Sequence, residues 1–300
     1  ICAVIAVIEQ ESSFQADPVV AGLPRIVDKE IETRRQRYHL PKLMLDAALL
    51  TTSPDGRSYR KRIDALRTEK EMNALFEDMI SEFPNGKTLL SDYNPVRTAG
   101  PMQVSVAFAQ DQIKEKPYPY PRRSSIRDEV FSRRGGVYFG TAILLDYPAP
   151  YTRPLYRFAD FNAGRYSSRN AAFQAAVSRL SGQPLAQDGD LLRYTGGVPT
   201  AEPSATLAAL QPLAGRLGLS RADITRDLRL EKTPQFGQTP LYARVFALAD
   251  TQAGLRLPRE SLPQIDLKSP KIQRKLTTAW FAERVDGRHR TCLGRDHSSL

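Results

Sequence analysis

Two glutamates near the start of the chain, Glu9 and Glu11, are the first candidates for acid–base chemistry. Both lie in the run V-I-E-Q-E-S-S-F at residues 7–14, and the composition around this run predicts a helix over residues 1–14. On that helix, Glu11 shares a face with the apolar residues Val4, Val7, Ile8 and Phe14. Glu9 lies about 200° around the helix from Glu11, on the polar side.

An acid on an apolar helix face is suited to proton transfer. Loss of hydration disfavours the charged form of such a carboxyl group, which raises its pKa toward the range useful for a general acid at neutral pH. The helical spacing therefore favours Glu11 over Glu9. The structural alternative is a carboxylate at a helix end that reaches solvent or pairs with an arginine, and geometry alone gives the two interpretations equal weight.

Other chemistries find no matching pattern in the sequence. The three histidines and two cysteines show no HExxH or paired CxxC spacing, so no metal is expected. The sequence contains no G-x-S-x-G serine hydrolase motif, no P-loop and no G-x-G-x-x-G motif, so no cofactor is expected. Cys2 and Cys292 form either a disulfide that joins the two ends of the chain or two buried thiols.

The charge balance points to an anionic partner. Lys and Arg exceed Asp and Glu by 43 to 33, which gives a net charge of +10 and a pI near 9.7. A cell-wall polymer, acidic lipid headgroups or nucleic acid would each fit. The basic clusters are short and follow no RNP, zinc-finger or basic-zipper pattern, so nucleic acid is not expected as a partner. No apolar run reaches the roughly 18 residues of a membrane span.

Four short segments occur in the order found in one enzyme family. They are E-S-S-F at residues 11–14, N-P-V-R-T-A-G-P-M-Q at 94–103, G-V-Y-F-G-T-A-I-L-L at 136–145 and A-D-F-N-A-G at 159–164. They resemble the E-S-x-F, S-P-x-G-A-x-G-L-M-Q, G-x-x-Y-L and A-Y-N-A-G signatures of the soluble lytic transglycosylases, which have a goose-type-lysozyme-like fold. The resemblance covers about 110 of the 300 residues, in two pieces.

This resemblance implies that Glu11 is the single catalytic residue, because no second acid accompanies it in a matched segment. Glu11 would protonate the oxygen between N-acetylmuramic acid and N-acetylglucosamine and then act as a base, so that the sugar's own C6 hydroxyl forms a 1,6-anhydro end. The residues implied to line the glycan-binding cleft are Ser12, Asn94, Gly100, Met102, Gln103, Tyr138 and Asn162.

Several of these residues also have structural interpretations. For Ser12 we favour a structural contact to the loop at Gly100. Met102 and Tyr138 are residue types that more often belong to a core. Asn162 would order the turn before Gly164, in addition to any contact with an acetamido group.

The chain departs from the family pattern at several positions. Asn94 stands for Ser and Pro101 for Leu, and Phe161 stands for the tyrosine whose hydroxyl the resemblance would place near the acid. Either Tyr138 or Tyr166 supplies that hydroxyl, or the site is impaired. In addition, 79 residues separate Phe14 from Asn94 where the family has only a few, so a helical insertion is expected at about residues 20–92.

The elements expected to position these residues are helices. Apolar periodicity and end signals predict further helices at residues 26–51, 59–83, 103–115, 137–147, 151–162, 169–180, 206–217, 220–230, 240–253 and 270–285. Ser167 or Ser168 is expected to cap the helix at 169–180, Asp223 to complete a capping box, and Gly287 to end the last helix. The segment K-P-Y-P-Y-P at 116–121 predicts an extended chain.

The predicted fold class is all-α. Together with the resemblance, it implies a lysozyme-like catalytic domain at residues 1–195, with the helical insertion beside its cleft. Residues 196–300 are expected to form a helical accessory domain with no catalytic constellation of its own.

The expected partner is the glycan strand of peptidoglycan, and other readings stay open. The whole chain is more loosely similar to a family of enterobacterial outer-membrane lipoproteins of unknown function. That similarity implies an upstream signal peptide and lipid anchor, and a location in the periplasm at the outer membrane. The alternative function is a non-catalytic lipoprotein that binds peptidoglycan or peptide, and a third is a hydrolytic muramidase.

Overall fold

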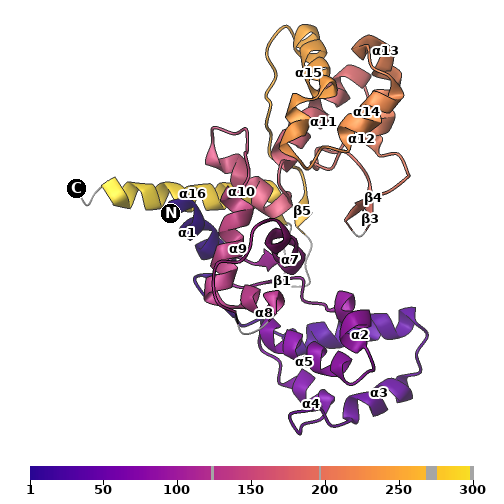
Figure 1. Cartoon of the computed structure of the whole chain (residues 1–300), viewed down its shortest axis with the longest axis vertical. Coiled ribbons are helices and arrows are strands. Elements are labelled where there is room, and N and C mark those ends of the chain that lie inside the picture. The colour runs from indigo at the N-terminus through magenta and orange to yellow at the C-terminus, as the bar shows by residue number, and fades with distance from the viewer. Residues whose placement is uncertain (123–124, 196, 268–275, 298–300) are drawn as a thin grey trace. The chain divides into compact units, whose positions relative to one another are not determined.

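Helices dominate the protein (Figure 1). The structure, a computed structural model, describes residues 1–122, 125–195, 197–267 and 276–297. It contains two compact units, one of residues 11–140 and one of residues 1–10 with 141–300. Strands occur in the described ranges only as two-residue antiparallel pairs. The predicted all-α class is therefore confirmed, whereas the lysozyme-like arrangement remains a prediction.

The unit of residues 11–140 includes the end of α1 and most of α9 (Arg133–Leu145). Its other elements are α2 (Leu23–Arg37), α3 (Lys42–Leu50), α4 (Tyr59–Asp64), α5 (Glu69–Ser81), α6 (Gly86–Leu90), η1 (Ser91–Tyr93), β1 (Thr98–Ala99), β2 (Val104–Ser105), α7 (Val106–Glu115) and α8 (Ile126–Phe131).

Helices α2 to α5 share a small core of their own within the segment predicted as an insertion. Its buried residues are Leu23, Leu49, Tyr59, Ile63, Leu66 and Leu75. Two long predicted helices are each divided in two here. The left-handed residue His39, at φ 53°, and Pro41 separate α2 from α3. Thr68 starts α5 with a capping box to Glu71, which separates it from α4.

The segment before α7 is a tight β-hairpin. Ala99 pairs with Val104 and Thr98 with Ser105, and the loop between them is Gly100 to Gln103. Gly100 and Gln103 both have left-handed backbones, with φ 76° and 49°. The helix expected from residue 103 therefore begins only at Val106, where the Ser105 hydroxyl caps it.

The second unit contains most of α1 (Cys2–Ser12) and the end of α9. Its other elements are α10 (Pro154–Ala163), α11 (Ser167–Ser181), β3 (Tyr194–Thr195), β4 (Val198–Pro199), α12 (Ala205–Leu210), η2 (Gln211–Leu213), α13 (Ala214–Leu217), α14 (Arg221–Leu228), η3 (Pro234–Gln238), α15 (Pro240–Ala253), β5 (Asp266–Leu267), β6 (Leu276–Thr277) and α16 (Thr278–His297).

Helices α11, α12, α14 and α15 gather around one apolar core (Figure 1). Phe173 and Val177 of α11 belong to it together with Phe236 and Val245, which lie beyond residue 196. The predicted division at residues 195 and 196 therefore does not coincide with either unit, because the core draws residues from both sides of it.

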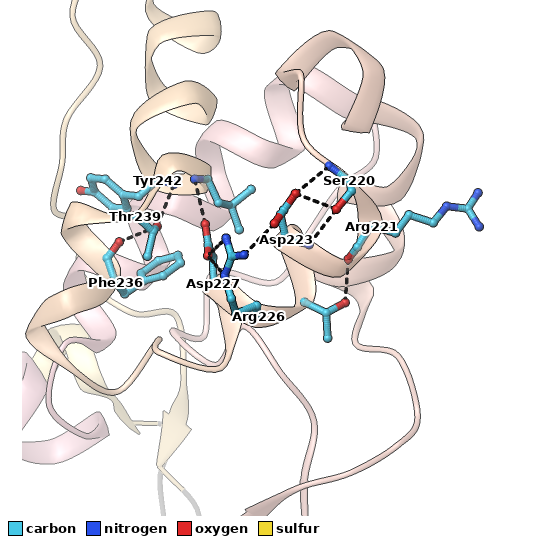
Figure 2. Close-up of polar contacts among 10 residues, drawn as sticks. Ser220, Arg221, Asp223, Arg226, Asp227, Phe236, Thr239 and Tyr242 are labelled. Atoms are coloured by element: carbon cyan, nitrogen blue, oxygen red, sulfur yellow. Dashed lines mark hydrogen bonds and ion pairs between the residues drawn. The ribbon is translucent and has the colours of Figure 1, made fainter.

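Polar contacts fix α14 against the start of α15 (Figure 2). The predicted capping box of Ser220 and Asp223 is present. Arg226 bonds to both Asp223, at 2.7 Å, and Asp227, at 2.9 Å. Asp227 in turn accepts a hydrogen bond of 3.2 Å from the Leu241 amide in the first turn of α15. Figure 2 also shows the Thr239 hydroxyl capping α15 at the Tyr242 amide.

Helix α16 extends well beyond its predicted end. It continues through Gly287 to His297, so the prediction that Gly287 ends the helix is wrong. Gly287 has an ordinary helical backbone and does not take the left-handed conformation that ends helices. The predicted start at Pro270 lies outside the described residues. No described helix combines the length and the apolar character that crossing a membrane requires.

A disulfide between Cys2 and Cys292 joins α1 to α16. Of the two interpretations that the sequence left open, the disulfide is the one present. Beside it, Arg288 of α16 donates to Gln10 Oε1 at 2.9 Å and pairs with Glu9 Oε1 at 3.2 Å. These contacts hold the first helix of the chain against the last.

Loss of this disulfide is expected to destabilise the protein. It spans 290 residues of sequence, so the bond strongly restricts the unfolded chain. Cys292→Ser should lower the free energy of unfolding by about 2–5 kcal/mol. Denaturant unfolding of the wild type and the variant measures the change. Reductant should bring the wild type to the variant's stability, and equal stability of oxidised wild type and variant would contradict this role.

Candidate functional site

Glu11 lies in the last turn of α1 and is half-buried. Helix α1 ends at Ser12, and the next two residues, Ser13 and Phe14, have left-handed backbones with φ 50° and 66°. Such conformations are uncommon for residues with a side chain and occur often at functional sites. Phe14 is 52% exposed, so the prediction that it shares the apolar face of Glu11 is wrong, because the chain leaves the helix first.

Glu9 lies on the solvent side, as the helical spacing predicted. Its side chain is 46% exposed and pairs with Arg288. The apolar face of α1 is formed by Ala6, Val7 and Ile8, which are buried. The two glutamates therefore differ in their surroundings in the expected direction.

Ser12 links the end of α1 to the β1–β2 loop. Its hydroxyl is buried and donates a hydrogen bond of 2.8 Å to the Pro101 carbonyl, 89 residues further along the chain. The predicted structural contact of Ser12 to the loop at Gly100 is confirmed. Glu11, the residue before Ser12, is thereby held close to that loop.

The same loop presses against two glycines of α9. A Cβ atom on Gly136 would lie 2.6 Å from Pro101 Cδ, and one on Gly140 would lie 2.4 Å from Met102 Sδ. Gly100 itself has no space for a side chain, since its Cβ would lie 2.2 Å from the Val130 carbonyl oxygen of α8. The loop and the helix approach this closely only because these three residues are glycine.

Gln103 is half-buried at the end of the loop. Its amide nitrogen donates to the Gly100 carbonyl at 3.3 Å, and its amide oxygen accepts from the Thr98 hydroxyl at 3.2 Å. These two bonds orient the side chain from within the hairpin. Gln103 is therefore a positioned polar group beside Gly100.

Two residues predicted to bind substrate are instead part of the interior. Met102 is fully buried against Gly140. Asn94 is fully buried as well, donating to Asn73 at 2.8 Å and accepting from the Val96 amide at 2.9 Å. Neither side chain reaches a surface where a glycan could contact it, so we leave both out of the site.

Tyr138 belongs to a cluster of aromatic rings. Its ring centre lies 5.1 Å from Tyr118, 5.9 Å from Tyr120 and 5.0 Å from Phe139. Tyr120 is 43% exposed. Tyr118 and Tyr120 belong to the predicted extended segment at 116–121. Sequence reasoning missed their place in this cluster, although the alternating P-Y-P-Y-P pattern distinguishes them.

A carboxylate lies next to this aromatic cluster. The Tyr118 hydroxyl donates to Glu129 at 2.9 Å, and burial together with this bond raises the pKa of Tyr118. Arg134 lies 3.6 Å from the same carboxylate and 5.2 Å from the Tyr120 ring centre. These contacts order the segment that precedes α8.

Asn162 belongs to the other unit. Its amide oxygen accepts a hydrogen bond of 2.8 Å from the Thr278 hydroxyl at the start of α16. Asn162 thus ties α10 to α16. The turn before Gly164 is instead closed by the Gly164 amide, which donates to the Asp160 carbonyl at 2.7 Å.

Asp160 is the polar centre of the A-D-F-N-A-G segment. It is fully buried and accepts from the amides of Tyr166 and Ser168, both at 2.7 Å, and from the hydroxyls of Tyr151 and Tyr147. The expected cap at Ser167 or Ser168 is wrong. Tyr166 is the N-cap residue, and the carboxylate of Asp160 supplies the acceptor from the preceding helix.

Metal ligands are not clustered in the part of the chain that the structure describes. The candidate site consists of Glu11, Ser12, the Gly100 loop with Gln103, and the aromatic cluster with the half-buried Tyr138 and the exposed Tyr120.

Comparison with known proteins shows the family. Residues 1–295 match the family described as protein of unknown function DUF1615, and the chain belongs to it. A relative from Escherichia coli (strain K12), described as the uncharacterized protein YaiW, is 53% identical over 293 residues, which cover 98% of this chain and 79% of the relative. No solved structure matches the chain. The family of unknown function expected from the sequence is thus supported.

Adding a methyl group at Gly140 is expected to disturb the site. In Gly140→Ala, the new Cβ would meet Met102 at 2.4 to 2.6 Å, so the hairpin loop must shift. We expect a loss of about 1–3 kcal/mol in the free energy of unfolding. The matched control is Gly287→Ala, which introduces the same methyl group into open space on α16 and should be neutral or slightly stabilising. Equal effects of the two substitutions would contradict the close packing.

Asp160 is expected to give the protein's stability a distinct pH dependence. Burial raises the pKa of Asp160 above its ordinary value, despite the hydrogen bonds that lower it. The folded state therefore binds this proton more tightly than the unfolded chain. The resulting stability is present below a pH of about 4 and is lost as the pH rises through the raised pKa.

Asp160→Asn tests this assignment. The amide has one acceptor oxygen where the carboxylate has two, so the variant should lose about 2–5 kcal/mol of stability. Its unfolding midpoint, followed over a series of pH values, should also lack the decline that begins near pH 4 in the wild type. Identical pH slopes for the two proteins would show that another group is responsible.

Proposed function

We propose that the protein is a lytic transglycosylase that cleaves the glycan strands of peptidoglycan through Glu11. The strongest support is that three of the four signature segments are in contact within one unit. The segment at 11–14 bonds to the segment at 94–103 through Ser12 and Pro101, and the latter packs against Gly136 and Gly140 of the third. Contact between segments this distant in sequence is what a shared site would require.

In the proposed reaction, Glu11 acts twice. As an acid it gives its proton to the glycosidic oxygen between N-acetylmuramic acid and N-acetylglucosamine, and the bond from C1 to that oxygen breaks. The substrate's 2-acetamido group shields the positive charge that develops at C1. The Glu11 carboxylate then takes the proton of the C6 hydroxyl, whose oxygen bonds to C1. Glu11 is protonated again and no water is consumed.

Neighbouring groups have supporting roles in the proposal. Gln103 and the backbone at Gly100 would hydrogen-bond the glycan, and the exposed Tyr120 with the half-buried Tyr138 would pack against sugar rings. Ser12 acts through the loop that it holds. The net charge of +10 suits a wall polymer whose peptides carry carboxylates.

The alternative, a non-catalytic protein that binds peptidoglycan or peptide, is favoured by one observation. Phe161 lacks the hydroxyl expected near the acid, and one of its two expected replacements is already committed elsewhere. Tyr166 is 2% exposed, and its ring packs against Arg169 and Tyr147. Tyr138 is then the remaining tyrosine that would supply the hydroxyl.

The proposed location is the periplasm, with an anchor to the outer membrane through lipid attached upstream. The disulfide between Cys2 and Cys292 supports an oxidising compartment. Peptidoglycan would be accessible to the protein there.

Digestion of purified sacculi tests the proposal. The wild type should release soluble muropeptides with anhydro ends, and Glu11→Gln should reduce the rate by at least about a hundredfold because the amide cannot transfer the proton. Glu9→Gln is the matched control on the exposed face of the same helix and should retain the wild-type rate.

The outcomes separate the two functions. Release of muropeptides by the wild type but not by Glu11→Gln supports the enzyme. Binding of sacculi without release by any of the three proteins supports the non-catalytic alternative. Equal release by the wild type and Glu11→Gln would overturn the role of Glu11.

A further inference from the structure

The second unit contains a cavity of about 920 Å³ that is independent of Glu11. It lies among the loop after α9, the 3-10 helix η3 with the start of α15, and the loop after α15. Its walls include the apolar rings of Pro148, Pro150, Pro234 and Pro258, and its polar lining includes Tyr166, Arg169, Tyr242, Arg256, Arg259 and Glu260. The space is large enough for a small organic molecule.

Arg169 is a buried cation whose hydrogen-bond acceptors are all neutral. The side chain is 2% exposed and donates to the Asn170 amide oxygen and to the carbonyls of Thr233 and Glu231. Its guanidinium lies near two rings, 4.4 Å from the centre of Tyr166 and 5.1 Å from that of Phe236. Burial lowers the pKa of Arg169. Among the described residues, no carboxylate pairs with it, although buried charges usually are paired.

Tyr166 is held against Arg169 in a strained backbone conformation. Its φ is 69°, a left-handed value that a residue with a ring rarely adopts. The buried carboxylate of Asp160 stabilises this conformation by accepting the Tyr166 amide at 2.7 Å. Strain that the surrounding structure maintains in this way is common where a ligand is clamped.

Positive charge also exceeds negative charge around the cavity. Arg259 is neutralised by Asp250, which accepts two hydrogen bonds from it at 2.7 and 3.1 Å. Arg256 is exposed and forms no close ion pair within the part of the chain that the structure describes. Glu260 is the one acidic residue in the lining. As far as the chain is described, the lining thus contains two arginines without a close ion pair, Arg169 and Arg256, and one carboxylate, Glu260.

We propose that this cavity binds a carboxylate-bearing organic ligand. The exposed Arg256 would bind the carboxylate, whose two oxygens suit its planar guanidinium, and the buried charge of Arg169 would add electrostatic attraction. Tyr242 and the prolines would pack against the apolar body of the ligand. The capping bond from the Tyr242 amide to Thr239 fixes the start of α15, from which the Tyr242 ring projects (Figure 2).

Matched acid and amide probes test the proposal. N-acetylphenylalanine, its carboxamide, and the tripeptide acetyl-Ala-Ala-Phe with a free carboxylate are titrated into the whole protein by calorimetry. The acid should bind saturably, and its carboxamide about tenfold more weakly or not at all. Tighter binding of the tripeptide identifies a peptide end as the source of the carboxylate, and equal binding identifies a small free acid. Equal binding of acid and amide, or no saturable binding by any probe, would overturn the proposal.

Variants assign the site. Arg256→Gln, at an exposed position, should weaken binding of the acid about threefold to tenfold, and Arg169→Lys, which keeps the buried charge, should weaken it by less than about threefold. Arg221→Gln, an exposed arginine of α14 outside the cavity lining, is the control and should bind as the wild type does. If Arg169→Lys does not fold, Arg256→Gln decides the test. The acid should also slow hydrogen exchange at residues 234–238, and unchanged exchange there would place the ligand elsewhere.

Discussion

The close approach of the Gly100 loop to α9 is the constraint on which the proposed site depends. Gly100, Gly136 and Gly140 have no side chain, so the loop and the neighbouring helices approach to distances at which an added Cβ atom would clash. The loop in that position presents the Pro101 carbonyl to Ser12, and the Ser12 bond fixes the end of α1. Glu11 is placed by the same turn. The Ser12 bond therefore fixes the backbone next to Glu11, the residue proposed as the general acid.

The sequence predicted the helical class and several ends well, because those signals are local. Helix α15 begins at Pro240 and ends before Gly254, and α14 has the expected capping box. Long-range packing decided the rest. Gly287 reads as a stop but lies inside α16, where the disulfide and the contacts to α1 hold the helix. Asp160 caps helix α11 although it lies seven residues before the helix starts, and no local sequence pattern predicts such a cap. Met102 matches a motif letter and Asn94 occupies a motif position, yet both side chains are buried and have structural roles.

Asp160 and Asn162 of the A-D-F-N-A-G segment both make structural contacts within the second unit. Asn162 binds α16, whereas Asp160 holds Tyr166 in its left-handed conformation against Arg169. The motif thereby contributes to the cationic cavity of the second unit. Because the chain belongs to DUF1615 and is 53% identical to YaiW, the proposals made for this protein can also be tested on its relatives. The proposed catalytic acid and the proposed carboxylate site belong to separate units and can be tested one at a time.

The origin of the oxygen at the new sugar end tests the central claim most directly. Sacculi are digested in water enriched in the heavy oxygen isotope, and the released fragments are weighed by mass spectrometry. If Glu11 directs the attack of the C6 hydroxyl, each new N-acetylmuramic acid end is lighter than a hydrolysed end by one water molecule and carries no heavy oxygen. One heavy oxygen at C1 of each new N-acetylmuramic acid end would identify a hydrolase, and the absence of any fragment would leave the chain without the proposed activity.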